Sequence, residues 1–213
     1  MNKVFIGYDT RSDIPWQVCE HSIKRFNNDV KVEPLAQQDL RQRKLYWREP
    51  DKLGSTEFTF TRFLVPHIMD YKGWALFCDD DVIFLEDVQN LFNLVDDKYA
   101  VMCVQHEYKP KPGSKMDGRV QTQYPRKNWS SLVLWNCGHP SNQNLTVDVI
   151  NNEDTTGKYL HRFSWLEDEE IGSLPIDWNW LVGWYKEPKD GKPKALHYTE
   201  GGPWFKDYRN CEY

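Results

Sequence analysis

Residues 74–85 of this chain read WALFCDDDVIFL, and this stretch decides the fold prediction. The first five residues are too few for a helix, and their bulky side chains are typical of a buried strand. Three aspartates follow, and their mutual repulsion and lost hydration are relieved if a hard divalent cation binds where the strand ends at a cleft. In an extended chain, the side chains of Asp79 and Asp81 point to the same side. We therefore predict a metal site at Asp79, Asp80 and Asp81.

The triplet has a second interpretation, because acidic residues are also common where a strand turns into a helix. There they hydrogen-bond their own backbone and cap the helix that follows. Short motifs of this kind often occur by accident. The rest of the chain has to decide between a metal site and a turn.

The length and net charge of the chain limit which classes of protein it can belong to. The 213 residues are enough for one domain with a sizeable core, and we predict a single domain over residues 1–213. The net charge of -5 and the scattered basic residues argue against a nucleic-acid partner. The five cysteines are odd in number and lack paired metal spacing, which favours reduced thiols in the core.

The sequence also predicts a location. The chain enters an apolar run at once, without a charged lead or a small-residue cleavage site. No apolar run approaches the roughly 20 residues that span a bilayer. We therefore expect a cytoplasmic protein with no transmembrane segment. The 10 tryptophans suit sugar faces, but such rings also serve cores and interfaces, and we favour the structural role.

The beginning of the chain predicts a strand, a helix and a second strand. Residues 3–7 are apolar, and residues 14–26 show helical spacing after Pro15. Residues 30–35 are a second strand-like run. This order predicts an α/β fold with a Rossmann-like, mostly parallel central sheet and flanking helices. Ligands bind beyond the carboxyl ends of such strands, which places residues 8–13 and the aspartates on one rim.

The loop after the first strand offers groups for a nucleotide. It lacks the glycine patterns of dinucleotide-binding and P-loop enzymes, so both classes are disfavoured. Tyr8 and Asp9 can stack on and hydrogen-bond a nucleobase, and we assign Arg11 to the same ligand. Asp9 can equally cap a turn.

Arg62 is a charged residue among apolar neighbours on one face of a helix that we predict from Ser55 into the aspartate strand. A buried guanidinium needs an anionic partner, which the aspartates or a bound phosphate would supply. An arginine at the edge of a helix can instead extend its charged end into water.

Three later segments also carry candidate groups. Residues 167–170 read EDEE, and a carboxylate there can orient a sugar hydroxyl or stabilise positive charge at a reacting carbon, although acidic residues are common in a first helical turn. His197 ends a strand-like run before Gly201 and Gly202, which suits a metal ligand beside a diphosphate because glycine lets backbone N–H groups approach closely. Residues 106–124 predict a loop over the rim, either a lid or plain surface.

Taken together, these motifs resemble nucleotide-sugar-dependent glycosyltransferases of the glycosyltransferase-A fold, most closely the family-8 type that includes glycogenin and bacterial lipopolysaccharide galactosyltransferases. The resemblance covers almost the whole chain. It includes a base-binding loop within residues 4–13, an arginine before the acidic motif, and Asp-x-Asp at a strand end. A later acidic segment at residues 168–170 and a closing motif at residues 197–204 complete it. The order and spacing of Asp-x-Asp and the closing motif make the set fairly specific.

The resemblance implies a metal-dependent enzyme that moves a sugar from a nucleoside diphosphate sugar to a carbohydrate or glycoconjugate acceptor. The expected donor is a UDP-sugar. Asp79, Asp81 and His197 would hold Mn²⁺ or Mg²⁺ against the donor diphosphate. The cation would stabilise the departing nucleoside diphosphate as a Lewis acid.

The resemblance also implies roles around the metal. Asp80 would contact the ribose, and Arg62 would neutralise charge near the donor. Asp168 would bind the transferred sugar, with Glu169 beside the reacting carbon. The family retains the configuration of that carbon, but Glu169 replaces the family's glutamine, and a carboxylate there can act as nucleophile or base.

The closing motif departs from the family's pattern. It is one residue short, and Gly202 stands where the family has a lysine that grips the diphosphate. Backbone amides at Gly201 and Gly202, or the side chain of Lys206, would take that role. The family's asparagine and small-residue strand is only loosely matched at residues 129–131, which leaves sugar recognition open.

Two other classes of protein share some of these features. A metal-dependent phosphohydrolase of the haloacid dehalogenase type also carries Asp-x-Asp at a strand end, but usually on the first strand. A non-enzymatic carbohydrate-binding protein would use the tryptophans. Its sugar binding would be indifferent to metal and nucleotide, and unaffected by Asp81→Asn.

Overall fold

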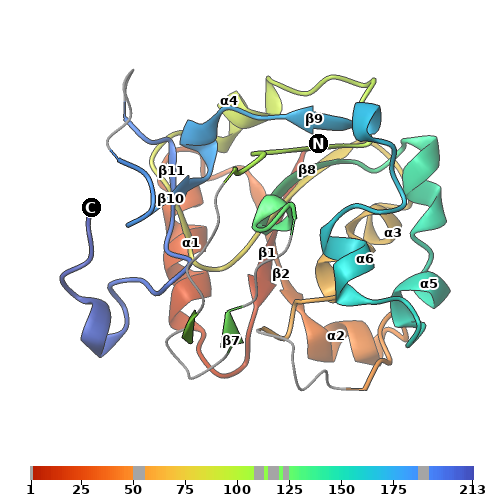
Figure 1. The fold of residues 1–213 in the computed structure, drawn as a ribbon, viewed down its shortest axis with the longest axis horizontal. Coiled ribbons are helices and arrows are strands. Elements are labelled where there is room, and N and C mark those ends of the chain that lie inside the picture. Colours follow the sequence, from red (N-terminus) through yellow and green to blue (C-terminus); the bar gives the residue numbers. More distant parts are fainter. Residues whose placement is uncertain (1, 50–55, 108–112, 115–119, 122–124, 187–191) are drawn as a thin grey trace.

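The computed structural model describes residues 2–49, 56–107, 113–114, 120–121, 125–186 and 192–213 (Figure 1). Its strands are β1 (Lys3–Tyr8), β2 (Lys31–Ala36), β3 (Trp74–Cys78), β4 (Val82–Phe84), β5 (Val101–Cys103), β6 (Gly113–Ser114), β7 (Val120–Gln121), β8 (Leu132–Asn136), β9 (Ile171–Ser173), β10 (Trp180–Leu181) and β11 (Ala195–His197). Its α-helices are α1 (Ile14–Lys24), α2 (Gln37–Gln42), α3 (Val65–Ile68), α4 (Val88–Phe92), α5 (Val147–Asn151) and α6 (Gly157–His161). The 3-10 turns are η1 (Thr61–Leu64), η2 (Trp129–Ser131), η3 (Pro140–Asn144), η4 (Asp168–Glu170), η5 (Ile176–Trp178) and η6 (Lys206–Tyr208).

A central sheet organises the molecule, with the strand order β2-β1-β3-β8-β5-β9. β1 pairs in parallel with β2 and β3, and β5 pairs in parallel with β9. β8 runs antiparallel to both of its neighbours, β3 and β5. All strands of this sheet except β8 therefore point the same way. The predicted α/β fold with a mostly parallel central sheet is confirmed.

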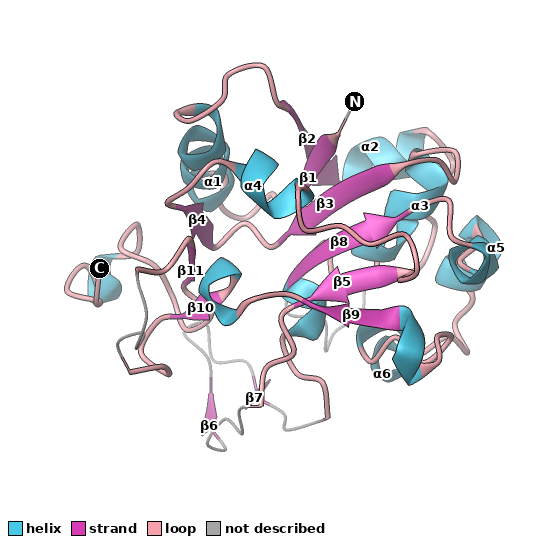
Figure 2. Ribbon diagram, turned by 90° about the horizontal axis from the view of Figure 1, so that it is seen from above, coloured by secondary structure: helices cyan, strands magenta, loops and turns pink. Residues whose placement is uncertain are grey.

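Helices cover both faces of this sheet, because successive side chains of a buried strand point to opposite faces. Phe5 packs in a core with residues of α2, α3, α5 and α6. Val4 and Ile6, its neighbours in β1, pack in a second core with residues of α1 and α4. Figure 2 shows these two groups of helices on opposite sides of the strands. The result is a three-layer arrangement with the sheet in the middle.

A smaller sheet, with the order β10-β11-β4, meets the central sheet at the aspartate triplet. β3 ends at Cys78 in the central sheet, and β4 begins at Val82 in the smaller one. Residues 79–81 are the whole connection between β3 and β4. They are therefore held from both ends by strands whose hydrogen bonds belong to different sheets.

The opening strand–helix–strand unit forms as predicted, as β1, α1 and β2. Pro15 occupies the first turn of α1, where its missing N–H has no helical partner to lose. The cysteines are free thiols, and Cys19, Cys78, Cys103 and Cys137 are buried, as predicted for reduced core residues.

Two predicted elements differ from the structure. The long helix before the aspartate strand is only the turn η1 followed by α3, because proline at position 66 has no N–H for the carbonyl of Arg62 and would clash with it in a continuous helix. The strand predicted from Asn128 begins only at Leu132. Asn128 is left-handed, with φ 63°, and the turn η2 follows it. Ser55 and most of the predicted loop at residues 106–124 lie outside the described residues.

Candidate functional site

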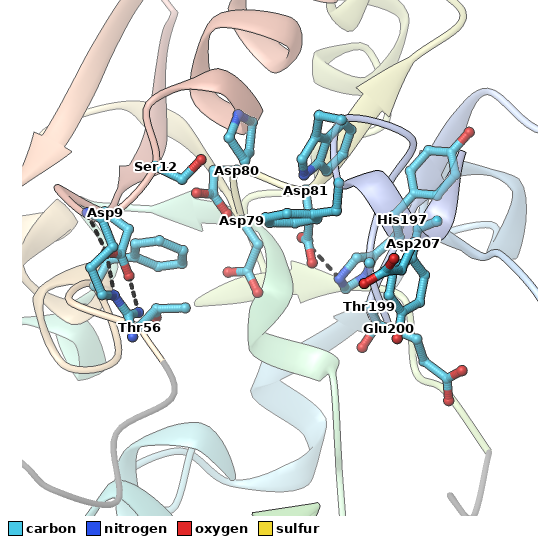
Figure 3. A pocket seen from close by; sticks show the side chains of 18 of the residues that line it. Asp9, Ser12, Thr56, Asp79, Asp80, Asp81, His197, Thr199, Glu200 and Asp207 are labelled. Carbon is cyan, nitrogen blue, oxygen red and sulfur yellow. Dashed lines mark hydrogen bonds and ion pairs between the residues drawn. The ribbon is translucent and has the colours of Figure 1, made fainter. Parts of the chain in front are cut away.

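A cavity of about 540 Å³ opens where the two sheets meet. Figure 3 shows Asp9 and Thr56 at one end, the aspartate triplet in the middle, and Glu200 and Asp207 beyond His197. Several of the site residues predicted from the sequence line this cavity: Asp9, Arg11, Asp79, Asp80, Asp81, His197, Gly201 and Lys206. The rim predicted from the strand order therefore exists as a single cavity.

The predicted metal ligands come together at its centre. One ligand atom from each of Asp79, Asp81 and His197 lies within 4.8 Å of the other two. Strand pairing produces this proximity, because β11 runs antiparallel to β4 with His197 opposite Val82. The backbone N–H of Tyr198 also donates to the carbonyl of Asp81 at 3.0 Å.

The donor atoms fit a hard divalent cation. Carboxylate oxygens and a neutral imidazole nitrogen are suitable ligands for Mn²⁺, and carboxylates suit Mg²⁺. Two neighbouring octahedral ligands, each about 2.1 Å from one cation, lie about 3 Å from each other. Asp81 Oδ1 and His197 Nε2 are 3.2 Å apart, which matches this separation. His197 is 2% exposed, so its ring is held firmly by its surroundings.

Arg62 contacts the candidate metal site from outside the cavity. Its side chain donates to Asp79 Oδ1 at 2.7 Å and to the carbonyl of Ser130 at 2.9 Å. The rings of Phe58 and Phe77 flank the guanidinium at 5.3 and 5.0 Å. The anionic partner predicted for this buried arginine is thus an aspartate of the triplet. Arg62 is not among the residues that line the cavity, and its role toward a donor stays a prediction.

Asp80 has a different environment from its two neighbours. Burial, together with the charges of Asp81, Asp79 and Asp9, raises the pKa of Asp80 to about 9. Without a cation, this carboxyl group is therefore neutral at neutral pH and can donate a hydrogen bond. A bound divalent cation opposes the effect, because its positive charge favours the ionised carboxylate.

At the other end of the cavity, Asp9 and Arg11 form a pair. The Asp9 carboxylate accepts hydrogen bonds from Arg11 Nε at 2.7 Å, from Arg11 Nη2 and from the backbone N–H of Arg11 at 3.1 Å. Burial acts to raise the pKa of Asp9, but these bonds outweigh it and lower that pKa below its usual value. Tyr8 does not line the cavity, and its ring packs edge-on against Trp16 at 6.1 Å.

The closing segment forms the wall beyond the metal ligands. Gly201 lines the cavity with φ 133°, a conformation that favours glycine. Gly202 lies beneath the Trp204 ring, where an added Cβ would come within 2.3 Å of it. This packing explains why no side chain stands at position 202. Lys206 is exposed and lines the cavity, and its role in replacing a lysine at position 202 stays a prediction.

Asp168 and Glu169 lie elsewhere, on the turn η4. The Asp168 side chain is 81% exposed and forms an ion pair with Arg126. Neither residue lines the cavity. The structure thus brings the predicted metal ligands and the loop carrying Asp9 and Arg11 together but keeps this acidic turn apart, and the sugar-binding role of Asp168 stays a prediction.

The sequence patterns missed two kinds of site residue. Phe58 and Phe205 add apolar groups to the cavity wall, and only the general abundance of aromatic residues signalled them, whereas Trp204 was identified as the last residue of the closing motif. Asn179 lies behind His197, with its Oδ1 2.9 Å from His197 Nδ1, and it is fully buried. An asparagine between two tryptophans at positions 178 and 180 is a visible signal, because a buried amide needs partners.

Solved structures with a similar fold are glycosyltransferases. The glycosyltransferase GlyE of Streptococcus pneumoniae matches 97% of this chain and 57% of its own, with a TM-score of 0.64 and 18% identity. The galactosyltransferase LgtC matches 98% of this chain and 91% of its own (TM-score 0.57, 13% identity). Mouse xyloside xylosyltransferase 1 matches 95% of this chain and 100% of its own (TM-score 0.56, 11% identity). The chain has the glycosyltransferase-A fold.

Sequence comparison gives the family. The chain is 56% identical over 216 residues to Protein CDI of Arabidopsis thaliana, covering 99% of this chain and 82% of that protein. It therefore belongs to the family of Protein CDI. No protein-family model matches the chain. The chain spans little more than half of GlyE, at 57% of its length.

The sequence predicted no transmembrane segment, and the helices of the described residues bear on this expectation. None of the helices formed by them is both long and apolar enough to cross a bilayer.

Proposed function

We propose that this chain is a metal-dependent glycosyltransferase that moves a sugar from a nucleoside diphosphate sugar, with UDP as the expected nucleotide, to a carbohydrate or glycoconjugate acceptor. One observation carries the proposal. Ligand atoms of Asp79, Asp81 and His197 converge within 4.8 Å on the wall of a cavity in a glycosyltransferase-A fold. The proposed cation is Mn²⁺ or Mg²⁺.

The electrostatics of the cavity support a cation between protein and donor. The wall carries the carboxyl groups of Asp9, Asp79, Asp80 and Asp81. Arginines pair with the first two, at Arg11 and Arg62. A diphosphate is itself strongly anionic, and a divalent cation between it and these carboxyl groups would offset their mutual repulsion.

The residues of this chain would then divide the work. When bound, the cation supplies Lewis-acid stabilisation of the leaving diphosphate. Asp79, Asp81 and His197 would hold it, and Arg62 would orient Asp79 through its hydrogen bond to Oδ1. Backbone N–H groups of the Gly201 loop and the exposed Lys206 would bind diphosphate oxygens that the cation does not contact.

The remaining assignments concern the two ends of the donor. Asp80 would hydrogen-bond the ribose, and the Asp9–Arg11 pair would bind the base, with Tyr8 supporting the loop. An acceptor hydroxyl then attacks the anomeric carbon. We assign Asp168 to the transferred sugar and Glu169 to the reacting carbon, with retention of configuration as the expected outcome. Cytoplasmic localisation and one domain over residues 1–213 are part of the same proposal.

Calorimetric titration of UDP, with GDP as the control nucleotide, tests the proposal. The expected result is UDP binding that requires Mn²⁺, disappears in EDTA, and is lost in Asp79→Asn/Asp81→Asn. A donor-sugar screen that follows diphosphate release then identifies the sugar. Binding of neither nucleotide under any metal condition would overturn the proposal.

Two further assays separate the rival classes. Phosphatase activity that vanadate inhibits would indicate a phosphohydrolase. Sugar binding that is unchanged by EDTA and by Asp81→Asn would indicate a carbohydrate-binding protein without transferase activity.

A further inference from the structure

Behind His197 lie two buried residues to which the proposed chemistry gives no role. Asn179, just before β10, is 0% exposed, and Ser131, at the end of η2, is 3% exposed. His197 Nδ1 is 2.9 Å from Asn179 Oδ1, and Asn179 Nδ2 is 2.9 Å from Ser131 Oγ. Ser131 Oγ donates in turn to the backbone carbonyl of Asn128 at 2.6 Å. These groups form one chain of hydrogen bonds that ends at a candidate metal ligand.

The carbonyl at the far end fixes the direction of every proton in this chain. A carbonyl can only accept, so the single hydroxyl proton of Ser131 is committed to Asn128. The Asn179 atom that faces Ser131 must therefore donate, which makes it the amide nitrogen and turns the amide oxygen toward His197. Because that oxygen can only accept, His197 carries its proton on Nδ1.

The consequence falls on the other ring nitrogen. With Nδ1 protonated, Nε2 of neutral His197 has a lone pair, and this is the atom 3.2 Å from Asp81 Oδ1. Two acceptors face each other there, an arrangement that a cation between them stabilises. In the other tautomer, Nε2–H would donate a hydrogen bond directly to Asp81 Oδ1. An Nε2 that carries a proton has no lone pair for a metal.

We propose that Asn179, oriented by Ser131, is a positioning residue that holds His197 in the Nδ1-protonated tautomer and so keeps Nε2 available to the cation. The inference rests on the proposed function, because it concerns the same cation site. Metal-bound histidines usually donate their other N–H to a carboxylate, a carbonyl or water. Here an amide accepts that proton, which adds no further negative charge beside the aspartates.

Nitrogen-15 NMR of the metal-free full chain tests the tautomer directly. At about pH 8, above the usual pKa of histidine, the two ring nitrogens have different shifts in the two tautomers. The signal is identified among the 6 histidines by its loss in His197→Gln. We expect Nδ1–H in the native chain and in Asn179→Asp, whose carboxylate still accepts. In Asn179→Leu, we expect the Nε2–H form to become populated.

Mn²⁺ titration gives an independent measurement. Loss of a residue that orients a metal ligand typically weakens binding about 10–100-fold, and we expect a loss of this size in Asn179→Leu. Asn179→Asp should retain most of the affinity. Ser131→Ala should lose some affinity because the Asn179 amide can then rotate, but less than Asn179→Leu, which removes the amide.

Asn142→Leu is the matched control. Asn142 is also 0% exposed, and its amide bonds to the carbonyls of Ala100 and Asn136 and to the indole of Trp165, none of which lines the cavity. This variant should lose stability by a similar mechanism but keep native Mn²⁺ affinity. Thermal melting of each variant shows whether the comparison is made between folded proteins.

The outcomes separate this inference from the proposed function. Nε2–H in the native chain, or Mn²⁺ affinity in Asn179→Leu equal to that of Asn142→Leu, would overturn the positioning role. If the native chain binds no Mn²⁺, both the proposed metal site and the claim that Nε2 serves a cation are rejected. The tautomer of the metal-free chain still decides whether Asn179 sets the position of the proton.

Discussion

Two acidic clusters of this chain look alike in the sequence, DDD at residues 79–81 and DEE at residues 168–170. We call them the strand-end cluster and the turn cluster. The strand-end cluster joins two sheets on the wall of a cavity, and Arg62 and His197 contact it. The turn cluster forms η4 at the surface, and its Asp168 side chain is 81% exposed.

The difference shows that neighbours, rather than the number of carboxylates, make an acidic cluster into a candidate site. In the turn cluster, Glu170 satisfies local groups: it accepts from the backbone N–H of Glu167 at 2.9 Å and from the hydroxyl of Ser141. This capping box is a structural use of acidic side chains. In the strand-end cluster, the partners come from β11 and η1, which are distant in sequence.

The largest expected effect comes from removing two charges of the strand-end cluster. Asp79→Asn/Asp81→Asn should weaken Mn²⁺ binding and metal-dependent UDP binding by more than about 100-fold, because losing direct ligands costs more than the 10–100-fold typical of their supporting residues. Isothermal calorimetry measures both affinities.

Asp168→Asn/Glu169→Gln is the control for that prediction. It removes the same number of charges from the turn cluster and should leave both affinities unchanged, while the proposed contact with the transferred sugar predicts a lower transfer rate. Equal losses of Mn²⁺ affinity in the two double variants would contradict the distinction between the clusters.

Arg62→Met should have the next largest effect, on stability. The variant removes the guanidinium from the ion pair with Asp79, and breaking a buried ion pair from one side costs about 3–5 kcal/mol. We expect the lower end of this range, since the Asp79 side chain is 19% exposed. Urea unfolding of the metal-free chain measures the change. A loss below about 1 kcal/mol, typical of surface ion pairs, would show that Arg62 does not brace the cluster.

The two clusters should also respond to pH in opposite directions. Burial raises the pKa of Asp80 to about 9, whereas the unfolded value is about 4. Between these values the folded chain binds more protons than the unfolded chain, so Asp80 makes stability fall as pH rises from about 4 to about 9. Asp80→Asn should flatten this decline in urea unfolding measured with EDTA present. An unchanged pH profile would count against the raised pKa.

Glu170→Gln supplies the opposite case. Burial acts to raise the pKa of Glu170, but hydrogen bonds from Ser141 and the Glu167 backbone outweigh it and lower that pKa. Its stabilising contribution is therefore present above the unfolded pKa of about 4.3 and is lost as pH falls below it. Glu170→Gln should reduce the loss of stability in acid and leave the alkaline side unchanged. Loss of stability confined to the alkaline side would contradict this assignment.

The smallest expected effect is that of Asp168→Asn on stability. Its ion pair with Arg126 is mostly exposed on the aspartate side, and such pairs contribute about 0–1 kcal/mol. Urea unfolding should therefore give a midpoint close to that of the native chain. A loss as large as that of Arg62→Met would mean that the turn cluster is more tightly integrated than its exposure indicates.

The sequence was most informative where a pattern is local. Apolar runs and Pro15 predicted β1, α1 and β2, and the run before Asp79 predicted β3. It was least informative where a single residue interrupts a longer pattern. Pro66 shortened the predicted helix, and the left-handed Asn128 converted the start of a predicted strand into a turn that carries Ser131.

By itself, the sequence determined the α/β architecture, the position of the aspartates at a strand end, and their family resemblance, because these depend on the order and spacing of residues along the chain. Tertiary structure alone decided which groups face one another. The pairing of β11 with β4 brings His197 to Asp81, and Asn179, which directly follows η5, contacts His197. Such contacts depend on strand register and on burial in three dimensions, and neither the distances nor the proton positions that follow from them are encoded in local pattern.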